Sequence, residues 1–160
     1  MWRTGGLGEF YTYTPPFTTP GFEANEDQCS APPFSDCNSE FGNSVGRGAF
    51  TFKAGTRITI AERIRLNDVG MANGEIELWV YGNSVIKVTG LILRGESSGR
   101  IRGLMMQTFF GGMWRVVLGS TLGVSTHFSH HRIGSDQSWA SPQDQDAYFS
   151  DFSVAITQKL

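Results

Sequence analysis

Residues 75–89 have the sequence EIELWVYGNSVIKVT, which is typical of a β-hairpin. Two runs rich in β-branched and aromatic residues flank the segment Gly82-Asn83-Ser84. Such runs favour strands, and Gly and Asn are the residues that tight hairpin turns use most. We therefore predict two antiparallel strands joined by a short turn.

The segment just before this hairpin alternates in the same way. Within residues 57–66, one parity carries the apolar side chains Ile58, Ile60, Ile64 and Leu66. The other parity is mostly polar, so we expect a strand with one buried face and one face in water. Arg63 and Arg65 fall on the polar parity, and we expect both side chains to be solvated.

Further strands are expected along the whole chain, over residues 49–53, 91–94, 101–110 and 147–156. Residues 15–48 are dominated by Pro, Gly, Asn, Ser, Asp and Glu, which predicts a long surface loop. No segment favours a helix. The predicted fold class is all-β, an antiparallel β-sandwich or jelly roll.

The chain has 160 residues, which predicts a single domain over residues 1–160 with a sizeable core. Its 13 basic and 15 acidic residues are interspersed and give a net charge of −2. This balance argues against a nucleic-acid or membrane partner. No apolar run of about 18 residues is present, so no transmembrane helix is expected. The first residues lack the apolar core of a signal peptide, so none is expected in this chain.

The two cysteines, Cys29 and Cys37, lie eight positions apart within the predicted loop. We expect a disulfide between them, which would place the protein in an oxidising compartment. Two free thiols are the alternative. The polar surroundings favour the disulfide, because they offer a free thiol no apolar environment.

Residues 113–134 (MWRVVLGSTLGVSTHFSHHRIG) differ from the rest of the chain. This segment holds all three histidines, His127, His130 and His131, and no acidic residue. A metal site is one interpretation, but no carboxylate or thiol nearby completes a set of ligands. Our hypothesis is a non-native insert translated from an intron, since the 22 residues correspond to 66 nucleotides in frame.

Near the N-terminus, the stretch Gly8-Glu9-Phe10-Tyr11-Thr12-Tyr13-Thr14 alternates cleanly. On a strand, Glu9, Tyr11 and Tyr13 share one face. Two phenols and a carboxylate on one face suit a sugar-binding groove or an acid/base pair. The alternative is that these tyrosines only cover a half-buried sheet, as β-propensity alone would explain.

Five blocks of the sequence, in order, resemble polysaccharide lyase family 14 domains. They are MWRTGGLGEFYTYTPP, VGRGAFTFKAG, ERIRLNDVGMANGEIELWVYGNSVIKVTGLILR, GRIRGLMMQTFFGG and SWASPQDQDAYFSDFSV. They match the C-terminal two-thirds of these domains. The resemblance implies a jelly roll that binds an acidic polysaccharide and cleaves it by β-elimination, with alginate or glucuronan as substrate types. It implies no cofactor and no metal.

The resemblance also implies roles for individual residues. The family's catalytic Tyr-x-Tyr pair matches Tyr11 and Tyr13. The reaction needs a base, an acid and a group that neutralises the uronate carboxylate. A tyrosine has a usual pKa of about 10, so a base tyrosine needs a cation beside it. The candidate substrate-binding residues are Arg3, Glu9, Arg47 and Gln107. For Arg47 a plain loop charge is the alternative, and for Gln107 a satisfied polar group on a half-wet strand.

The sequence departs from the family's pattern at its start. The family's Ser-x-Arg pair and its active-site Lys would precede Met1, as would the early strands of the two sheets. We therefore expect an N-terminally truncated domain, from an extracellular and monomeric parent protein. The competing functions are a non-catalytic carbohydrate-binding jelly roll and an inactive gene fragment.

Overall fold

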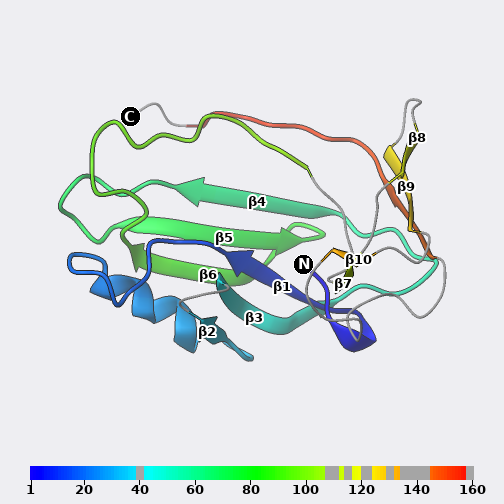
Figure 1. The fold of residues 1–160 in the computed structure, drawn as a ribbon, viewed down its shortest axis with the longest axis horizontal. Helices are drawn as coiled ribbons and strands as arrows, with labels where there is room; N and C mark the ends of the chain where they lie inside the picture. Colours follow the sequence, from blue (N-terminus) through cyan, green and yellow to red (C-terminus); the bar gives the residue numbers. More distant parts are fainter. Residues whose placement is uncertain are drawn as a thin grey trace. The chain divides into compact units, whose positions relative to one another are not determined.

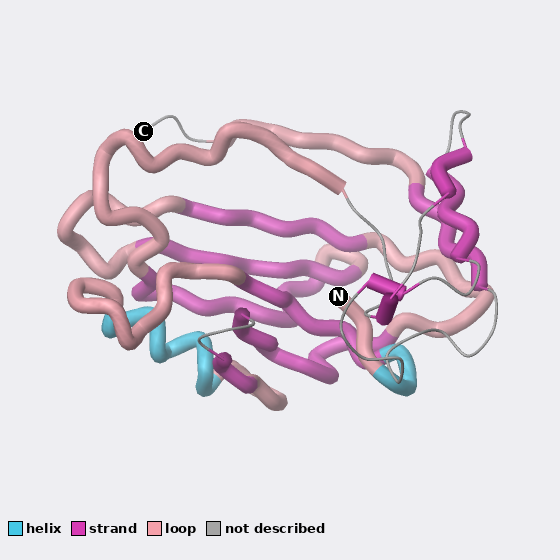
Figure 2. The backbone as a smooth tube through the Cα atoms, viewed as in Figure 1, coloured by secondary structure: helices cyan, strands magenta, loops and turns pink. Residues whose placement is uncertain are grey.

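The computed structural model describes residues 1–38, 42–106, 112–113, 117–119, 124–128, 132–133 and 145–157. The chain divides into two compact units, residues 1–101 and 102–160, which are considered separately below. Strands dominate the described residues of both units (Figures 1 and 2). All of the strand pairs that the structure describes are antiparallel, as the sequence predicts.

The predicted hairpin is present in the first unit. Strands β5 (Gly74–Val80) and β6 (Asn83–Leu91) pair antiparallel, and β4 (Ile60–Arg65) pairs with the other edge of β5. The sheet order is therefore β4-β5-β6. At the turn, Tyr81 and Gly82 have φ angles of 50° and 79°. Two positive φ values match the twist of a hairpin, and this explains why a glycine follows Tyr81.

A second sheet of the first unit has the order β1-β3-β2. It consists of β1 (Leu7–Thr12), β2 (Asp36–Asn38) and β3 (Gly42–Thr51). The first residues of the chain, which precede the short 3₁₀ turn η1 (Thr4–Gly6), fold back onto β1. Trp2 bridges Gly8 there, and the backbone amide of Glu9 donates to the Met1 carbonyl at 3.0 Å.

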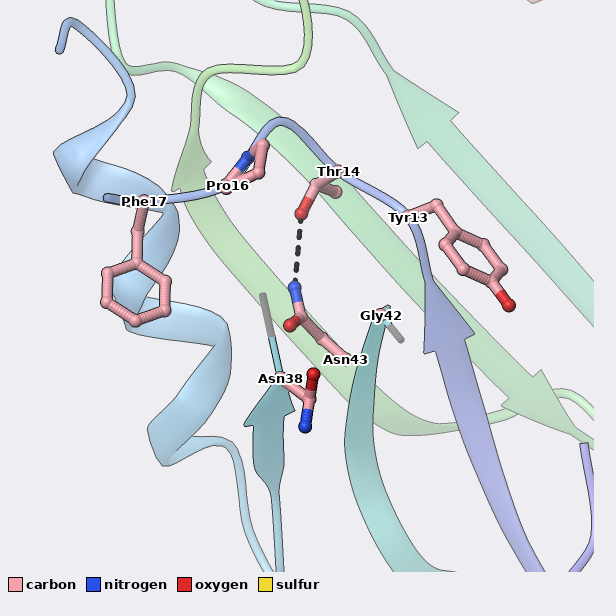
Figure 3. A pocket seen from close by; sticks show the side chains of 7 residues that line it. All are labelled: Tyr13, Thr14, Pro16, Phe17, Asn38, Gly42 and Asn43. Atoms are coloured by element: carbon pink, nitrogen blue, oxygen red, sulfur yellow. Dashed lines mark hydrogen bonds between the residues drawn. The ribbon is translucent and has the colours of Figure 1, made fainter. Parts of the chain in front are cut away.

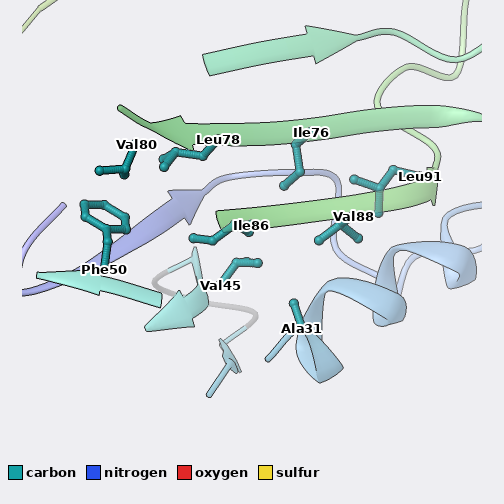
Figure 4. Close-up of a cluster of buried hydrophobic side chains, with 9 residues drawn as sticks. All are labelled: Ala31, Val45, Phe50, Ile76, Leu78, Val80, Ile86, Val88 and Leu91. Atoms are coloured by element: carbon teal, nitrogen blue, oxygen red, sulfur yellow. The ribbon is translucent and has the colours of Figure 1, made fainter. Parts of the chain in front are cut away.

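One hydrophobic core lies between these two sheets (Figure 4). Val45 and Phe50 from β3 face the apolar side chains of β5 and β6, and Ala31 closes one side. The buried members from β5 and β6 are Ile76, Leu78, Val80, Ile86, Val88 and Leu91. The alternation along β5 produces this arrangement, because every second residue of the strand points to the same side.

Burial on β4 differs from the prediction. Ile60 and Ile64, expected to be buried, are 37% and 46% exposed. They lie on the same side of the sheet as Ile76 and Val80, their partners on β5. However, β4 is an edge strand, and none of its described residues joins the buried cluster. The side of the strand to which these residues point was predicted correctly. Alternation in the sequence does not tell whether other residues cover that side of the sheet.

The predicted loop over residues 15–48 contains more structure than expected. A 3₁₀ helix, η2 (Glu23–Ser30), lies within it, as do β2 and the first residues of β3. Cys29 at the end of η2 forms a disulfide with Cys37 of β2, with the Cα atoms 5.4 Å apart. The side chain of Gln28 is fully buried and bonds Thr12 and Thr14, which fixes η2 against the end of β1.

In the second unit, β7 (Gly112–Met113) pairs with β10 (Arg132–Ile133). A further sheet has the order β11-β9-β8, with β8 (Val117–Gly119), β9 (Val124–Phe128) and β11 (Gln145–Phe149). The strand predicted over 147–156 therefore ends at Phe149, and residues 101–106 of the strand predicted over 101–110 are not in a strand. The remainder of that segment, residues 107–110, lies outside the described residues.

The suspected insert at 113–134 includes β8, β9 and β10, and its other residues after Met113 lie outside the described part. Its origin as an intron stays a prediction. The sandwich or jelly roll is supported only in its coarser form, as antiparallel sheets, and a closed sandwich stays a prediction. Among the described residues, no helix is long and apolar enough to cross a membrane.

Candidate functional site

A buried carboxylate organises the face of β1 that points away from the core. Glu9 is 0% exposed, and its two oxygens meet two different arginines. Arg3 Nε and Nη2 both lie 2.7 Å from Glu9 Oε1, and Arg47 Nε donates to Oε2 at 2.8 Å. One carboxylate therefore holds two guanidinium groups at fixed positions.

A serine completes this ion-pair cluster. Ser44 Oγ donates to Glu9 Oε2 at 2.6 Å and accepts from Arg47 Nη2 at 2.9 Å. Burial of the Glu9 carboxylate on its own raises its pKa, but hydrogen bonds from Arg3, Ser44 and Arg47 outweigh that effect. The pKa of Glu9 is therefore held below its usual 4.5. Glu9 is an anion at neutral pH.

An irregular pairing of β1 with β3 brings these residues together. Gly8 pairs with Phe50 and Phe10 pairs with Val45, so Glu9 alone lies opposite residues 46–49 of β3. This β-bulge contains Arg47 between Gly46 and Gly48, whose φ angles are 65° and 87°. Such backbone angles suit glycine, and bulges commonly redirect a side chain in this way.

The two tyrosines continue the same face of β1. Their ring centroids are 5.4 Å apart, with an interplanar angle of 78°, an edge-to-face contact. The Arg3 guanidinium carbon lies 5.4 Å from the Tyr11 ring centroid, within the range of a cation–π contact. Tyr11 is partly buried, whereas Tyr13 is 79% exposed.

Tyr11 holds its proton more tightly than an ordinary phenol. Burial raises its pKa above the usual 10.0, Tyr13 and Glu9 raise it further, and the charge of Arg3 opposes them without prevailing. The cation that the chemistry requires is therefore present beside Tyr11. In this arrangement it does not produce a phenolate at neutral pH, so Tyr11 is suited to donate a proton.

The structure brings together five of the six residues predicted for the site: Arg3, Glu9, Tyr11, Tyr13 and Arg47. Gln107 lies outside the described residues. Full burial removes Glu9 from direct contact with a ligand, and it serves to position the arginines instead. Of the histidines weighed as metal ligands, His127 belongs to β9, and His130 and His131 lie outside the described residues.

Two contributors were missed from the sequence. Ser44 pairs with Tyr11 in the β1–β3 register, and its hydroxyl joins the Glu9 cluster. Phe34 lies beneath Arg47, whose guanidinium carbon is 5.0 Å from the ring centroid. The spacing Ser44-x-x-Arg47 was the only hint of Ser44 in the sequence. It points to the Glu9 cluster only once the register between β1 and β3 is known.

A small pocket lies at the end of β1, next to Tyr13 (Figure 3). Its volume is about 130 Å³. In Figure 3 the amides of Asn38 and Asn43 lie between the ring of Phe17 and that of Tyr13. The other lining residues are Thr14, Pro16 and Gly42. The ionic cluster thus lies at one end of β1, and the pocket, whose described lining residues carry no charge, lies at the other end.

Comparison with known proteins assigns the chain to a family. The family profile described as Polysaccharide lyase 14 matches residues 1–152. The crystal structure of the marine PL-14 alginate lyase from Aplysia kurodai is similar to this chain, with a TM-score of 0.62 and 29% sequence identity. The similarity covers 93% of this chain and 48% of the alginate lyase, so the chain spans about half of that protein's length. No curated protein matches the sequence. Because the family profile covers nearly the whole chain, this chain belongs to the polysaccharide lyase 14 family.

Proposed function

We propose that this chain supplies the acid/base tyrosines and a carboxylate-binding cation site for β-elimination on a uronic-acid polysaccharide, of the alginate or glucuronan type. The observation that carries the proposal is the placement of two arginines and two tyrosines on one face of one sheet. The similar alginate lyase supports the choice of an acidic polysaccharide.

The arginine pair fits the first requirement of the reaction. Removing the proton next to the uronate carboxylate builds negative charge on that group, so a cation must stabilise it. Glu9 neutralises one of the two guanidinium charges, which leaves the cluster with one positive charge in excess. The side chains of Arg3 and Arg47 are 32% and 28% exposed, so a ligand carboxylate can still reach them.

The tyrosine pair fits the proton transfers. In the elimination, a base takes the proton from the carbon beside the carboxylate, and a carbon–carbon double bond forms. The bond to the glycosidic oxygen breaks, and that oxygen receives a proton from an acid. We assign the donor role to Tyr11, because its raised pKa keeps it protonated. Tyr13, which is largely exposed beside it, is then the group that takes the proton, and this role requires Arg3, now in contact with Tyr11, to lie close enough to Tyr13 to favour its phenolate.

Secretion of the parent protein is part of this proposal. Polymers of uronic acids do not diffuse across a cell membrane, so we place their cleavage outside the cell. The disulfide between Cys29 and Cys37 supports this location, since disulfides persist in oxidising compartments.

The test measures the absorbance of the unsaturated uronate product. Residues 1–160 and the full-length product of the gene are incubated with alginate and with glucuronan. We expect an absorbance increase that Tyr11→Phe abolishes, and Tyr81→Phe serves as the matched control at the exposed β5–β6 turn. No product from either protein would overturn the lyase function.

A non-catalytic carbohydrate-binding domain is the second candidate. The exposed ring of Tyr13 favours it, because an aromatic ring open to solvent can stack on a sugar without any chemistry. Calorimetric titration with the same polymers separates the two candidates. Binding without product formation in the full-length protein would support this second function.

A further inference from the structure

The pocket at the end of β1 differs in chemistry from the ionic cluster on the same strand. The described residues that line it carry no charge, and they combine two aromatic rings with two amides and two hydroxyls. Aromatic faces stack on the apolar faces of sugar rings, while amides donate to and accept from hydroxyl groups. This composition suits a sugar ring recognised through its hydroxyls.

The walls of the pocket are held firmly. Thr14 Oγ1 accepts from Gln28 Nε2 at 2.7 Å and from Asn43 Nδ2 at 3.4 Å, which ties the end of β1 to η2 and β3. Asn38 follows Cys37, whose disulfide ties β2 to η2. A ligand that enters this pocket therefore meets side chains that are already ordered, which lowers the entropy cost of binding.

Close backbone approach sets the shape of the pocket beside Tyr13. A Cβ atom on Gly42 would lie 2.9 Å from the Thr12 carbonyl oxygen and 2.9 Å from the Tyr13 ring. The φ angle of Gly42, 94°, also favours glycine. The pocket thus depends on the absence of a side chain at this position, and Tyr13 forms its border with the proposed catalytic face.

We propose that this pocket is a sugar subsite adjacent to the catalytic tyrosines, and that it binds one ring of the polysaccharide through hydroxyl groups rather than through a carboxylate. The inference rests on the proposed lyase function and adds a specificity to it. A volume of about 130 Å³ is small beside the roughly 300–1,000 Å³ of pockets that enclose a whole ligand, so the pocket suits a single ring and not an oligosaccharide.

The two ends of β1 then recognise different parts of one chain. Glu9 and Tyr13 are four residues apart, which is roughly 13 Å along a strand. The sugar whose carboxylate is bound lies at the Arg3 and Arg47 end, and the ring in the pocket contributes no ion pair. The subsite therefore accepts a neutral sugar beside the reacting uronate, or a uronate whose carboxylate faces solvent.

The first experiment changes the charge of the pocket. Asn38→Arg places a cation at an exposed position on its rim, and Asn83→Arg is the matched control at the β5–β6 turn. Affinities for a short alginate oligosaccharide and for an uncharged cello-oligosaccharide are measured by calorimetric titration. We expect Asn38→Arg to strengthen binding of the alginate oligosaccharide by about two- to fivefold, the scale of an exposed ion pair, with no gain in Asn83→Arg.

The second experiment removes an aromatic wall. Phe17→Ala is compared with Phe22→Ala, a partly buried phenylalanine that does not line the pocket. We expect Phe17→Ala to weaken binding of the cello-oligosaccharide by about three- to tenfold, and to raise KM for the polymer while kcat stays nearly constant. Circular dichroism checks that both variants keep the fold.

The outcomes separate the subsite from the lyase function. If the cello-oligosaccharide does not bind, or binds equally to wild type and Phe17→Ala, the pocket is not a sugar subsite, whatever the activity on alginate. If it binds through Phe17 but no unsaturated product forms, the subsite stands and the lyase function fails. An equal gain in Asn38→Arg and Asn83→Arg would also overturn the subsite, because the effect would then be a general one of net charge.

Discussion

The outer faces of the two sheets in the first unit each carry a cluster of arginine and glutamate side chains. On β1 and β3, Arg3 and Arg47 share Glu9. On β4, β5 and β6, the ion pairs join Arg63, Arg65 and Lys87 to Glu75 and Glu77, over 2.8–3.7 Å. In each of these clusters the cations outnumber the carboxylates by one. Each cluster also has an arginine whose guanidinium carbon lies near an aromatic ring centroid, at 5.4 Å for Arg3 and Tyr11 and at 5.5 Å for Arg63 and Trp79.

The two clusters differ in burial at Glu9 and Glu75, whereas Glu77 of the second cluster is nearly as buried as Glu9, with a side chain that is 7% exposed. Glu9 is 0% exposed, whereas the Glu75 side chain is 20% exposed and its partners Arg63 and Arg65 are about half open to water. Exposed ion pairs are screened and contribute little, while a buried carboxylate fixes its partners and keeps its charge effective. The number of charged residues in the sequence alone does not distinguish the two clusters, since each has one cation in excess.

Replacing a phenol gives the largest expected contrast between the faces. Tyr11→Phe and Tyr13→Phe should each lower turnover by about 10²- to 10⁴-fold, the usual contribution of a positioned acid or base. Tyr81→Phe, at the end of the β4-β5-β6 sheet, should leave turnover within about twofold of wild type, because it removes no acid or base. The measurement is the initial rate of unsaturated product formation. Full activity in either Tyr11→Phe or Tyr13→Phe would refute the assignment of that residue.

The carboxylates provide the next contrast, in stability. Glu9→Gln should lower the free energy of unfolding by about 2–3 kcal/mol, since it leaves two partly buried guanidinium groups without their counter-charge. Glu75→Gln should cost less than about 1 kcal/mol. Urea denaturation of both variants and the wild type gives the two values. Equal losses would mean that burial does not distinguish the clusters.

The pH dependence of stability sharpens the same contrast. The pKa of Glu9 is lower in the folded chain than its usual 4.5, so its contribution is fully present above that value. This contribution is lost as the pH falls through the lower, folded pKa. Unfolding measured from neutral pH down to about pH 3 should show a loss of stability that is smaller in Glu9→Gln. If the free energy of unfolding falls with pH equally in the wild type and in Glu9→Gln, the lowered pKa of Glu9 would be contradicted.

Salt should produce the smallest effect. In 1 M salt the screening length is about 3 Å, so the cost of Arg65→Ala, whose ion pair is with the partly exposed Glu75, should fall from about 0.5 kcal/mol toward zero. The cost of Glu9→Gln should change much less, because its ion pairs are shielded from solvent. Urea denaturation at low and high salt tests both. If the cost of Glu9→Gln also disappears in 1 M salt, the ion pairs of Glu9 would be screened by solvent like exposed ones.

The sequence was most informative where the pattern is local. The hairpin of β5 and β6 followed from alternation and a turn, and the shared face of Glu9, Tyr11 and Tyr13 followed from the period of two in a strand. Both features depend on residues that are close in the chain. They needed no knowledge of the distant strands.

Features that depend on distant partners were not predictable. The exposure of Ile60 and Ile64 depends on what covers the sheet edge, and the contact of Ser44 with Glu9 depends on the register between β1 and β3. The 3₁₀ helix η2 is held by buried Asn25 and Gln28 rather than by an apolar stripe. The sequence of η2 therefore has no periodic pattern of hydrophobic residues from which the helix could be predicted.

The bulge in β3 separates a position that carries charge from the positions that pack in the core. Val45 and Phe50 keep their partners on β1 and their places in the core, whatever lies between them. Residues 46–49 lie outside the pairing of β1 with β3, and the backbone amides of Gly46 and Arg47 are instead bonded to Ser35 and Phe34. A substitution of Arg47 therefore changes the cation beside Glu9, while Val45 and Phe50 keep their places in the core. The charge of the ion-pair cluster and the packing of the core are thus encoded in separate positions of one strand.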